Sequence, residues 1–205
     1  MTAQDSLAGL VRGKSLTERA TGFVRYAVSH VTTDDFSRPT PCDQWDLRTL
    51  LSHVNDSLAT LSEGLENGRL GLEPDVPSDG GGDVLAVFRQ LTNRLLESWI
   101  CSGHDGDDRM IEVAGTPLHS LLLGGTGALE IAVHGWDIAT ACGVDCVIPT
   151  ALATDLYDFA RIAVSPDSRH PQFAEPVPVP ESATPADRLV AYLGRDPRMA
   201  FRRAP

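Results

Sequence analysis

Basic residues are scarce in this sequence. Seventeen lysines and arginines stand against 28 aspartates and glutamates among 205 residues, giving a formal net charge of -11. Such a charge repels a phosphate backbone, so we expect no nucleic-acid partner. Long apolar runs are also missing, both as a signal-peptide core and as a bilayer-spanning segment. We therefore expect a cytoplasmic protein without membrane contact, present as a monomer or a homodimer.

Paired cysteines and common catalytic motifs are absent too. Four cysteines are scattered along the chain without a C-x-x-C pair: Cys42, Cys101, Cys142 and Cys146. This spacing argues against a zinc knuckle and a disulfide scaffold. Because no cationic residue adjoins any of them, we interpret each as a small buried hydrophobe. No G-x-S-x-G, H-E-x-x-H or dinucleotide-binding fingerprint is present either.

Apolar residues recur at helical spacing through most of the chain, which predicts a mainly all-α protein. The helical patterns cover residues 15–31, 46–68, 84–96, 118–142 and 149–164. Four to five antiparallel helices with short connections predict a bundle. The 118–142 segment is apolar on nearly every side, so we expect it to be buried on nearly every side.

Capping residues locate several helix ends. We expect the second helix to begin near Asp46 and to end near Gly68, and Asp83 to cap the third. Residues 102–117 are interpreted as a polar connector with one weak alternating patch at 110–113.

The chain is divided into two parts. Residues 1–165 are assigned to a metal-binding helical bundle, and residues 166–205 to a proline-rich arm with one short helix packed on that bundle. Thr184 is the expected N-cap of the short helix, with Pro185 at its first position and Asp187 at its third.

Three polar residues interrupt the apolar 118–142 segment. Glu130, His134 and Asp137 are spaced by four and by three, which stacks them on one helix face. Burying a carboxylate without a partner costs many kcal/mol. A divalent cation bound by Glu130 and a neutral His134 would compensate that charge. Asp137 suits a supporting role, accepting a hydrogen bond from a ligand imidazole, from an indole or from a loop amide.

The third ligand should come from a facing helix, and His53 is the best candidate. It lies at the edge of the leucine stripe of the second helix, so it can reach inward without replacing a packing residue. Two histidines and one carboxylate leave a coordination position open, the pattern of a catalytic zinc site. Two alternatives stay open: a Glu130–His134 pair without metal, and a His53 that does not ligate.

Three segments in order resemble landmarks of the actinobacterial DinB-like family that includes mycothiol-dependent maleylpyruvate isomerase. They are PTPCDQWDLRTLLSHV, ALEIAVHGWDIATACG and PVPVPESATPADRLVAYLGRDP. The resemblance implies a DinB-like four-helix bundle and one divalent metal, Zn²⁺, on His53, Glu130 and His134. It also implies mycothiol as a co-substrate whose thiol the metal activates. The resemblance does not carry over the substrate, because maleylpyruvate isomerase has a larger C-terminal portion.

Other residues of these segments could serve the site. Cys42 and Trp45 could line its mouth, although Trp45 reads equally well as a packing anchor. Arg188 and Arg195 could contact an anion, with surface solvation as the simpler interpretation of each.

Three functions remain open at this point. The first is a zinc-dependent, mycothiol-using isomerase or S-transferase that acts on a small electrophilic substrate. The second keeps the metal but activates water or a carbonyl for a hydrolysis, lyase or rearrangement reaction. The third is a non-catalytic metal-containing binding protein.

Overall fold

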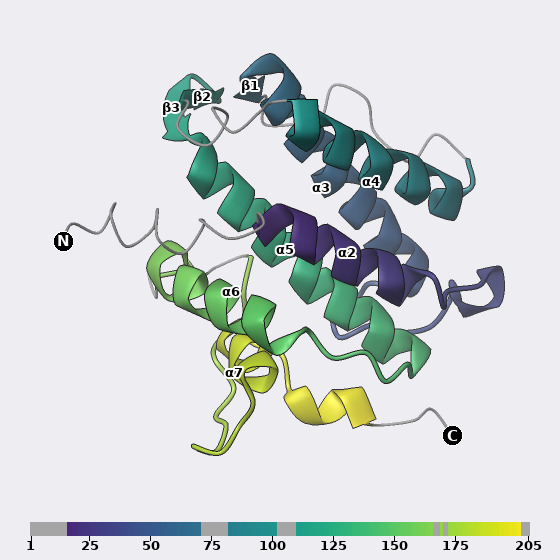
Figure 1. Cartoon of the computed structure of the whole chain (residues 1–205). Helices are drawn as coiled ribbons and strands as arrows, with labels where there is room; N and C mark the ends of the chain where they lie inside the picture. Colours follow the sequence, from purple (N-terminus) through teal and green to yellow (C-terminus); the bar gives the residue numbers. More distant parts are fainter. Residues whose placement is uncertain (1–15, 71–81, 102–109, 166–168, 170–171, 202–205) are drawn as a thin grey trace.

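Four long helices form the core of the computed structural model (Figure 1). The structure describes residues 16–70, 82–101, 110–165, 169 and 172–201. The helices are α2 (Leu16–Val28), α3 (Leu47–Asn67), α4 (Val84–Cys101) and α5 (Ser120–Cys142). Contacts run from α2 to α5, from α5 to α3, from α3 to α4 and from α4 back to α2. They close a four-helix bundle, which confirms the expected fold class.

Helix α5 lies at the centre of the molecule, covered by α2, α3 and α6 (Thr150–Ala163) (Figure 1). From Gly127 to Ala139 every residue except Glu130 is buried. This burial agrees with the nearly uniformly apolar sequence of the helix. Within the described residues, no helix is long and apolar enough to cross a membrane.

The ends of α3 follow the capping signals in the sequence. The Asp46 side chain accepts a hydrogen bond from the Thr49 amide at 2.8 Å, and Gly68 ends the helix in the left-handed conformation with φ 69°. Before the helix, Thr40 donates its hydroxyl to the Trp45 carbonyl at 2.9 Å and folds the connector back. The cap therefore fixes where His53 lies along α3.

A small sheet replaces part of the expected polar connector. Its strands are β1 (Arg69–Leu70), β2 (Met110–Val113) and β3 (Thr116–His119), in the order β1-β2-β3. β1 pairs with β2 in parallel, and β2 pairs with β3 as an antiparallel hairpin. Ala114 and Gly115 make the two-residue turn with φ 49° and 81°, the left-handed pair that tight hairpins need. The alternating patch was visible in the sequence, but its pairing partners were not.

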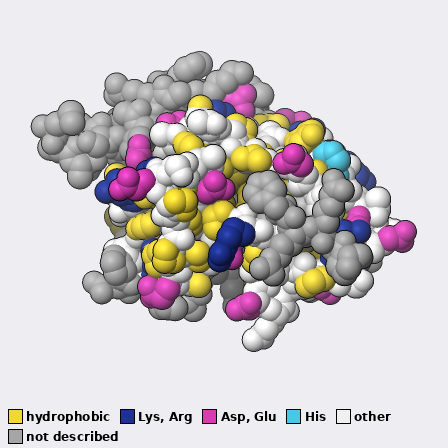
Figure 2. Space-filling view, turned by 90° about the horizontal axis from the view of Figure 1, so that it is seen from below, with side chains coloured by type: hydrophobic (Ala, Val, Ile, Leu, Met, Phe, Trp, Pro, Cys, Tyr) yellow, Lys and Arg dark blue, Asp and Glu magenta, His cyan; other side chains and the backbone are white. Residues whose placement is uncertain are grey.

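The C-terminal segment, of which the structure describes residues 169 and 172–201, packs along one side of the bundle. α7 (Pro185–Tyr192) begins with the expected capping box of Thr184 and Asp187 and packs against α6, and η4 (Pro197–Phe201) contacts α5. Buried Arg169 donates to the Ala174 carbonyl at 3.0 Å and to the Tyr192 carbonyl at 2.8 Å. These bonds join the start of the C-terminal segment to the end of α7. Seen from this side, acidic side chains are scattered among hydrophobic ones (Figure 2).

Glycines let α3 and α5 approach each other closely. A Cβ on Gly127 of α5 would overlap the Leu61 side chain of α3. In return, a Cβ on Gly64 of α3 would lie 2.9 Å from the Leu123 side chain of α5. Real Cβ atoms do not make contacts that short, so side chains larger than hydrogen would push the helices apart. The two helices that carry the candidate metal ligands therefore depend on these glycines.

We expect Gly127→Ala to lower the free energy of unfolding by about 1–3 kcal/mol, because the added methyl group overpacks the interface with Leu61. The matched control is Gly22→Ala in α2, where a Cβ meets nothing within 4 Å. That control should stabilise the protein by about 0.5–1 kcal/mol through helix propensity alone. Urea unfolding followed by circular dichroism measures both changes; a shift of the two variants in the same direction would contradict the packing argument.

Candidate functional site

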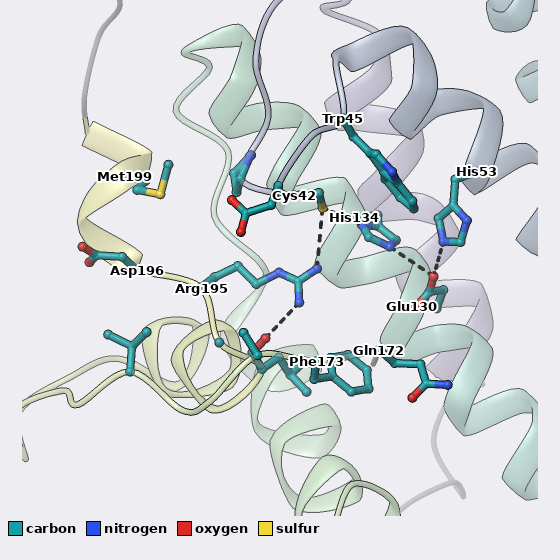
Figure 3. Close-up of a pocket in the computed structure, with 16 residues that line it drawn as sticks. Cys42, Trp45, His53, Glu130, His134, Gln172, Phe173, Arg195, Asp196 and Met199 are labelled. Carbon is teal, nitrogen blue, oxygen red and sulfur yellow. Dashed lines mark hydrogen bonds and ion pairs between the residues drawn. The ribbon is translucent and has the colours of Figure 1, made fainter. Parts of the chain in front are cut away.

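A cavity of about 700 Å³ lies between the bundle and the C-terminal segment (Figure 3). That size falls within the range of about 300–1,000 Å³ typical of small-molecule sites. Its apolar lining comes from both parts of the chain: Pro41, Trp45, Phe173, Ala174, Val177, Leu193 and Met199. The polar groups that it exposes include His53, Glu130, His134 and Arg195. The cavity is thus mostly apolar with a few convergent polar side chains.

The three residues proposed as metal ligands lie together at one side of this cavity. His53 projects from the second turn of α3, while Glu130 and His134 lie one turn apart on α5. Nε2 of His53 is 2.6 Å from Oε1 of Glu130, and Nε2 of His134 is 3.1 Å from the same oxygen (Figure 3). One ligand atom from each residue lies within 4.8 Å of the other two. The structure thus brings His53 of α3 together with the Glu130–His134 pair of α5, although His53 and Glu130 are 77 residues apart in the sequence.

This donor set fits a divalent transition metal. Imidazole nitrogen and carboxylate oxygen are ordinary zinc ligands, and three of them from the protein leave a fourth position open. Around a tetrahedral zinc ion, bond lengths near 2.05 Å would separate two ligand atoms by about 3.3 Å. In the structure, Oε1 of Glu130 lies 2.6 Å from Nε2 of His53 and 3.1 Å from Nε2 of His134. Small rotations of these side chains would therefore give the separations that an ion requires.

The second nitrogen of His134 faces Asp137. Nδ1 of His134 lies 2.9 Å from Oδ2 of Asp137, a carboxylate with no solvent exposure. Because the ionised carboxylate only accepts hydrogen bonds, the ring nitrogen must donate. This contact turns Nε2 toward Glu130 and the cavity, as carboxylate partners of metal-binding histidines do. Asp137 thus accepts a hydrogen bond from the imidazole of His134, one of the contacts that the sequence suggested for it.

The charges of this cluster shift one another's pKa. Burial raises the pKa of Glu130, but the hydrogen bonds from His134 and His53 outweigh burial and hold it well below its usual value. Burial lowers the pKa of His134, but its hydrogen bond to Asp137 and the other acceptors around it raise it well above the usual value. Both pKa shifts favour the charged forms of this pair, and metal binding through Nε2 of His134 would require that nitrogen to be free of its proton.

Glu130 is more accessible than the sequence suggested. Its side chain keeps 29% of its exposure, because the face of α5 that carries it opens on the cavity. The expectation that the carboxylate is buried away from solvent is therefore wrong for Glu130, although Asp137 is fully buried. The accessible carboxylate can reach a ligand that enters from the cavity.

Cys42 differs from the other described cysteines. Burial raises the pKa of both Cys142 and Cys146 to about 11. Cys146 is buried as expected, whereas Cys142 is only partly buried against the core. Cys42 instead lines the cavity, with its Sγ 3.3 Å from Oδ2 of Asp137 and 3.8 Å from Nη2 of Arg195. The interpretation of Cys42 as a buried hydrophobe is wrong, because the nearby cation comes from a distant part of the sequence.

The two arginines of the C-terminal segment have different roles. Arg188 is exposed and donates to the carbonyls of Glu181 and Ala183, so it contributes only to the turn before α7. Arg195 is only 11% exposed and pairs with Asp137, Nη2 to Oδ2, at 3.1 Å. Surface solvation was therefore the wrong interpretation of Arg195. The sequence named Arg195 only as a possible anion contact, and no sequence signal indicated its pairing with Asp137, which depends on how the C-terminal segment folds back.

Trp45 covers the histidines from the connector side (Figure 3). The centre of its indole ring lies 4.8 Å from that of His53 and 6.3 Å from that of His134. It is half-buried and lines the cavity. Trp45 therefore packs against the hydrophobic core and also lines the cavity, so the two sequence interpretations are compatible.

Comparison with known proteins agrees with this architecture. Two uncharacterised proteins of Mycobacterium tuberculosis, from strains CDC 1551 and H37Rv, are each 26% identical over 183 residues, covering 88% of this chain and 96% of the relative. A crystal structure of the mycothiol-dependent maleylpyruvate isomerase matches with a TM-score of 0.54 and 17% identity, covering 77% of this chain and 71% of that one. At that identity the structural match supports the fold alone.

The family profile of the mycothiol maleylpyruvate isomerase N-terminal domain matches residues 17–139. The matched segment includes all three candidate metal ligands and Asp137, and it spans the four helices of the bundle. It stops before the C-terminal segment that forms the other wall of the cavity. By its sequence over more than half of its length, the chain belongs to the mycothiol maleylpyruvate isomerase N-terminal domain family.

Proposed function

We propose that this protein is an enzyme that holds one zinc ion on His53, Glu130 and His134 and uses mycothiol as a co-substrate. In this proposal it isomerises a small electrophilic substrate or transfers the thiol to it. The convergence of the three donor atoms at the wall of a 700 Å³ cavity carries the proposal. Family membership supports the thiol, because the family takes its name from a mycothiol-using isomerase.

A zinc ion bound there would lower the pKa of a thiol in its open position, so that a thiolate forms at neutral pH. The chain supplies the conditions for this chemistry. Asp137 fixes the orientation of His134, and Trp45 shields the histidines from water. The carboxylate of Glu130 offsets part of the charge of an ion. The cavity is large enough for a thiol and a small electrophile to meet beside the three donors.

The first test of this proposal is metal binding. Metal-free protein titrated with zinc should take up one ion per chain, measured by calorimetry and by metal analysis. His53→Ala and His134→Ala should each weaken zinc binding by more than about 100-fold. Loss of an outer hydrogen-bond partner of a ligand weakens metal affinity by at most about that factor, and loss of a ligand itself should cost more. The matched control is His30→Ala, an exposed histidine bonded to the Tyr26 carbonyl, which should leave affinity unchanged.

Wild-type protein that takes up no zinc would contradict the proposal. The contacts of Glu130 with the two histidines would then be ordinary hydrogen-bonded pairs, the alternative that the sequence left open.

The second test is thiol entry. Cobalt-substituted protein titrated with mycothiol should show a saturable change in its visible spectrum and a new sulfur-to-metal charge-transfer band. S-methylated mycothiol, which has no free thiol, should give no such band. Cys42→Ser should keep the band, since the sulfur that causes it comes from the co-substrate and not from the chain.

Each other outcome favours a different function. If azide changes the cobalt spectrum but mycothiol does not, the site activates water or a carbonyl instead of a thiol. If neither ligand changes it, the ion has no exchangeable position and serves the structure of a non-catalytic protein.

A further inference from the structure

Each nitrogen of the Arg195 guanidinium has a partner within the chain. Its Nε and Nη2 donate to Oδ1 and Oδ2 of Asp137 at 3.4 Å and 3.1 Å, and its Nη1 donates to the Leu193 carbonyl at 2.9 Å. Nη2 also lies 3.8 Å from Sγ of Cys42 (Figure 3). All three nitrogens therefore have partners, although the residue lines the cavity. These contacts indicate that Arg195 binds groups of the protein itself rather than an anionic ligand in the cavity.

Asp137 needs a cation of this kind. Its side chain has no solvent exposure, and taking a carboxylate out of water is costly unless charge and hydrogen bonds compensate it. Arg195 supplies the charge and contacts both carboxylate oxygens, which also fixes the plane of the carboxylate. The free direction of Oδ2 is then set, and it points at Nδ1 of His134.

A continuous chain of contacts thus joins the C-terminal segment to a candidate metal ligand. It runs from Arg195 to Asp137, from Asp137 to Nδ1 of His134, and through the ring to Nε2, which faces Glu130. Such outer contacts orient the ligand ring and tune its basicity. The segment that bears Arg195 begins beyond residue 139, where the family match ends.

We propose that Arg195 is a positioning residue of the metal centre, acting through Asp137 on His134 rather than on substrate. The C-terminal segment then completes the metal centre as well as covering it. This inference rests on the proposed metal site at His53, Glu130 and His134.

A double-mutant cycle tests the proposed route of action. Zinc affinity is measured for Arg195→Gln, for Asp137→Asn and for the double variant. Each single variant should bind zinc about 10–100-fold more weakly than wild type, as expected for loss of an outer contact. Because Arg195 acts through Asp137, the double variant should bind no more weakly than the weaker single variant. Independent, multiplying losses would overturn the proposal.

Matched variants separate positioning from a general loss of structure. Arg198→Gln removes an exposed arginine three residues away that pairs with Asp196, and it should bind zinc as the wild type does. Arg195→Lys keeps the charge but not the two-point contact, so it should recover part of the affinity. The cobalt spectrum should change in Arg195→Gln and stay unchanged in Arg198→Gln. An equal change in both spectra would overturn the proposal.

Folding and metal binding are checked separately. Should Arg195→Gln fail to fold because it leaves Asp137 unpaired, the comparison uses Arg195→Lys and the double variant, in which no buried charge lacks a partner. In that case, zinc affinity in Arg195→Lys equal to that of wild type would overturn the proposal. Wild-type protein that binds no zinc refutes the proposed function itself. Wild-type protein that binds zinc, with Arg195→Gln binding as tightly or more tightly, refutes only the role of Arg195.

Discussion

Asp137 has no contact with solvent, and its charge must be met entirely by other parts of the chain. His134 meets it from the preceding turn of the same helix, and Arg195 meets it from the far end of the sequence. The first contact turns the ring of a candidate metal ligand, and the second draws the C-terminal segment onto the bundle. Together with the packing of α7 on α6, this contact holds the segment that forms the second wall of the cavity, so the buried carboxylate contributes to both the fold and the site.

The rest of the site depends on how closely α3 and α5 can approach. Glycines on both helices face leucines, and this spacing lets His53 and Glu130 meet at 2.6 Å. Close packing of this kind favours small residues at the interface. Glu130 lies on the face that opens on the cavity, whereas most of the buried positions of α5 around it are apolar, with His134 and Asp137 as the polar exceptions. His53 and Glu130 are therefore accessible from the cavity, whereas His134 is almost fully buried.

Much of the fold could be predicted from local signals. Asp46, Gly68 and Thr184 mark helix ends because capping is a local hydrogen-bonding requirement that a short stretch of sequence reveals. The burial of α5 could also be predicted, because a helix that is apolar on nearly every side must be covered on nearly every side. The β2–β3 hairpin was not predicted, because its strands are short and its stability depends on β1, which follows a different helix. Pairing between distant segments leaves only a weak local pattern.

The sequence by itself determined which side chains share the face of α5, because helical periodicity places Glu130, His134 and Asp137 in one line. It also indicated His53, since a histidine at the edge of a leucine stripe can face the bundle interior. Only the tertiary structure decided that Glu130 opens on a cavity, that Cys42 lies beside a cation and that Arg195 pairs with Asp137. These features arise where the C-terminal segment folds back on the bundle. Arg195 and Asp137 are 58 positions apart, and a contact at that distance along the chain produces no periodic pattern in the sequence.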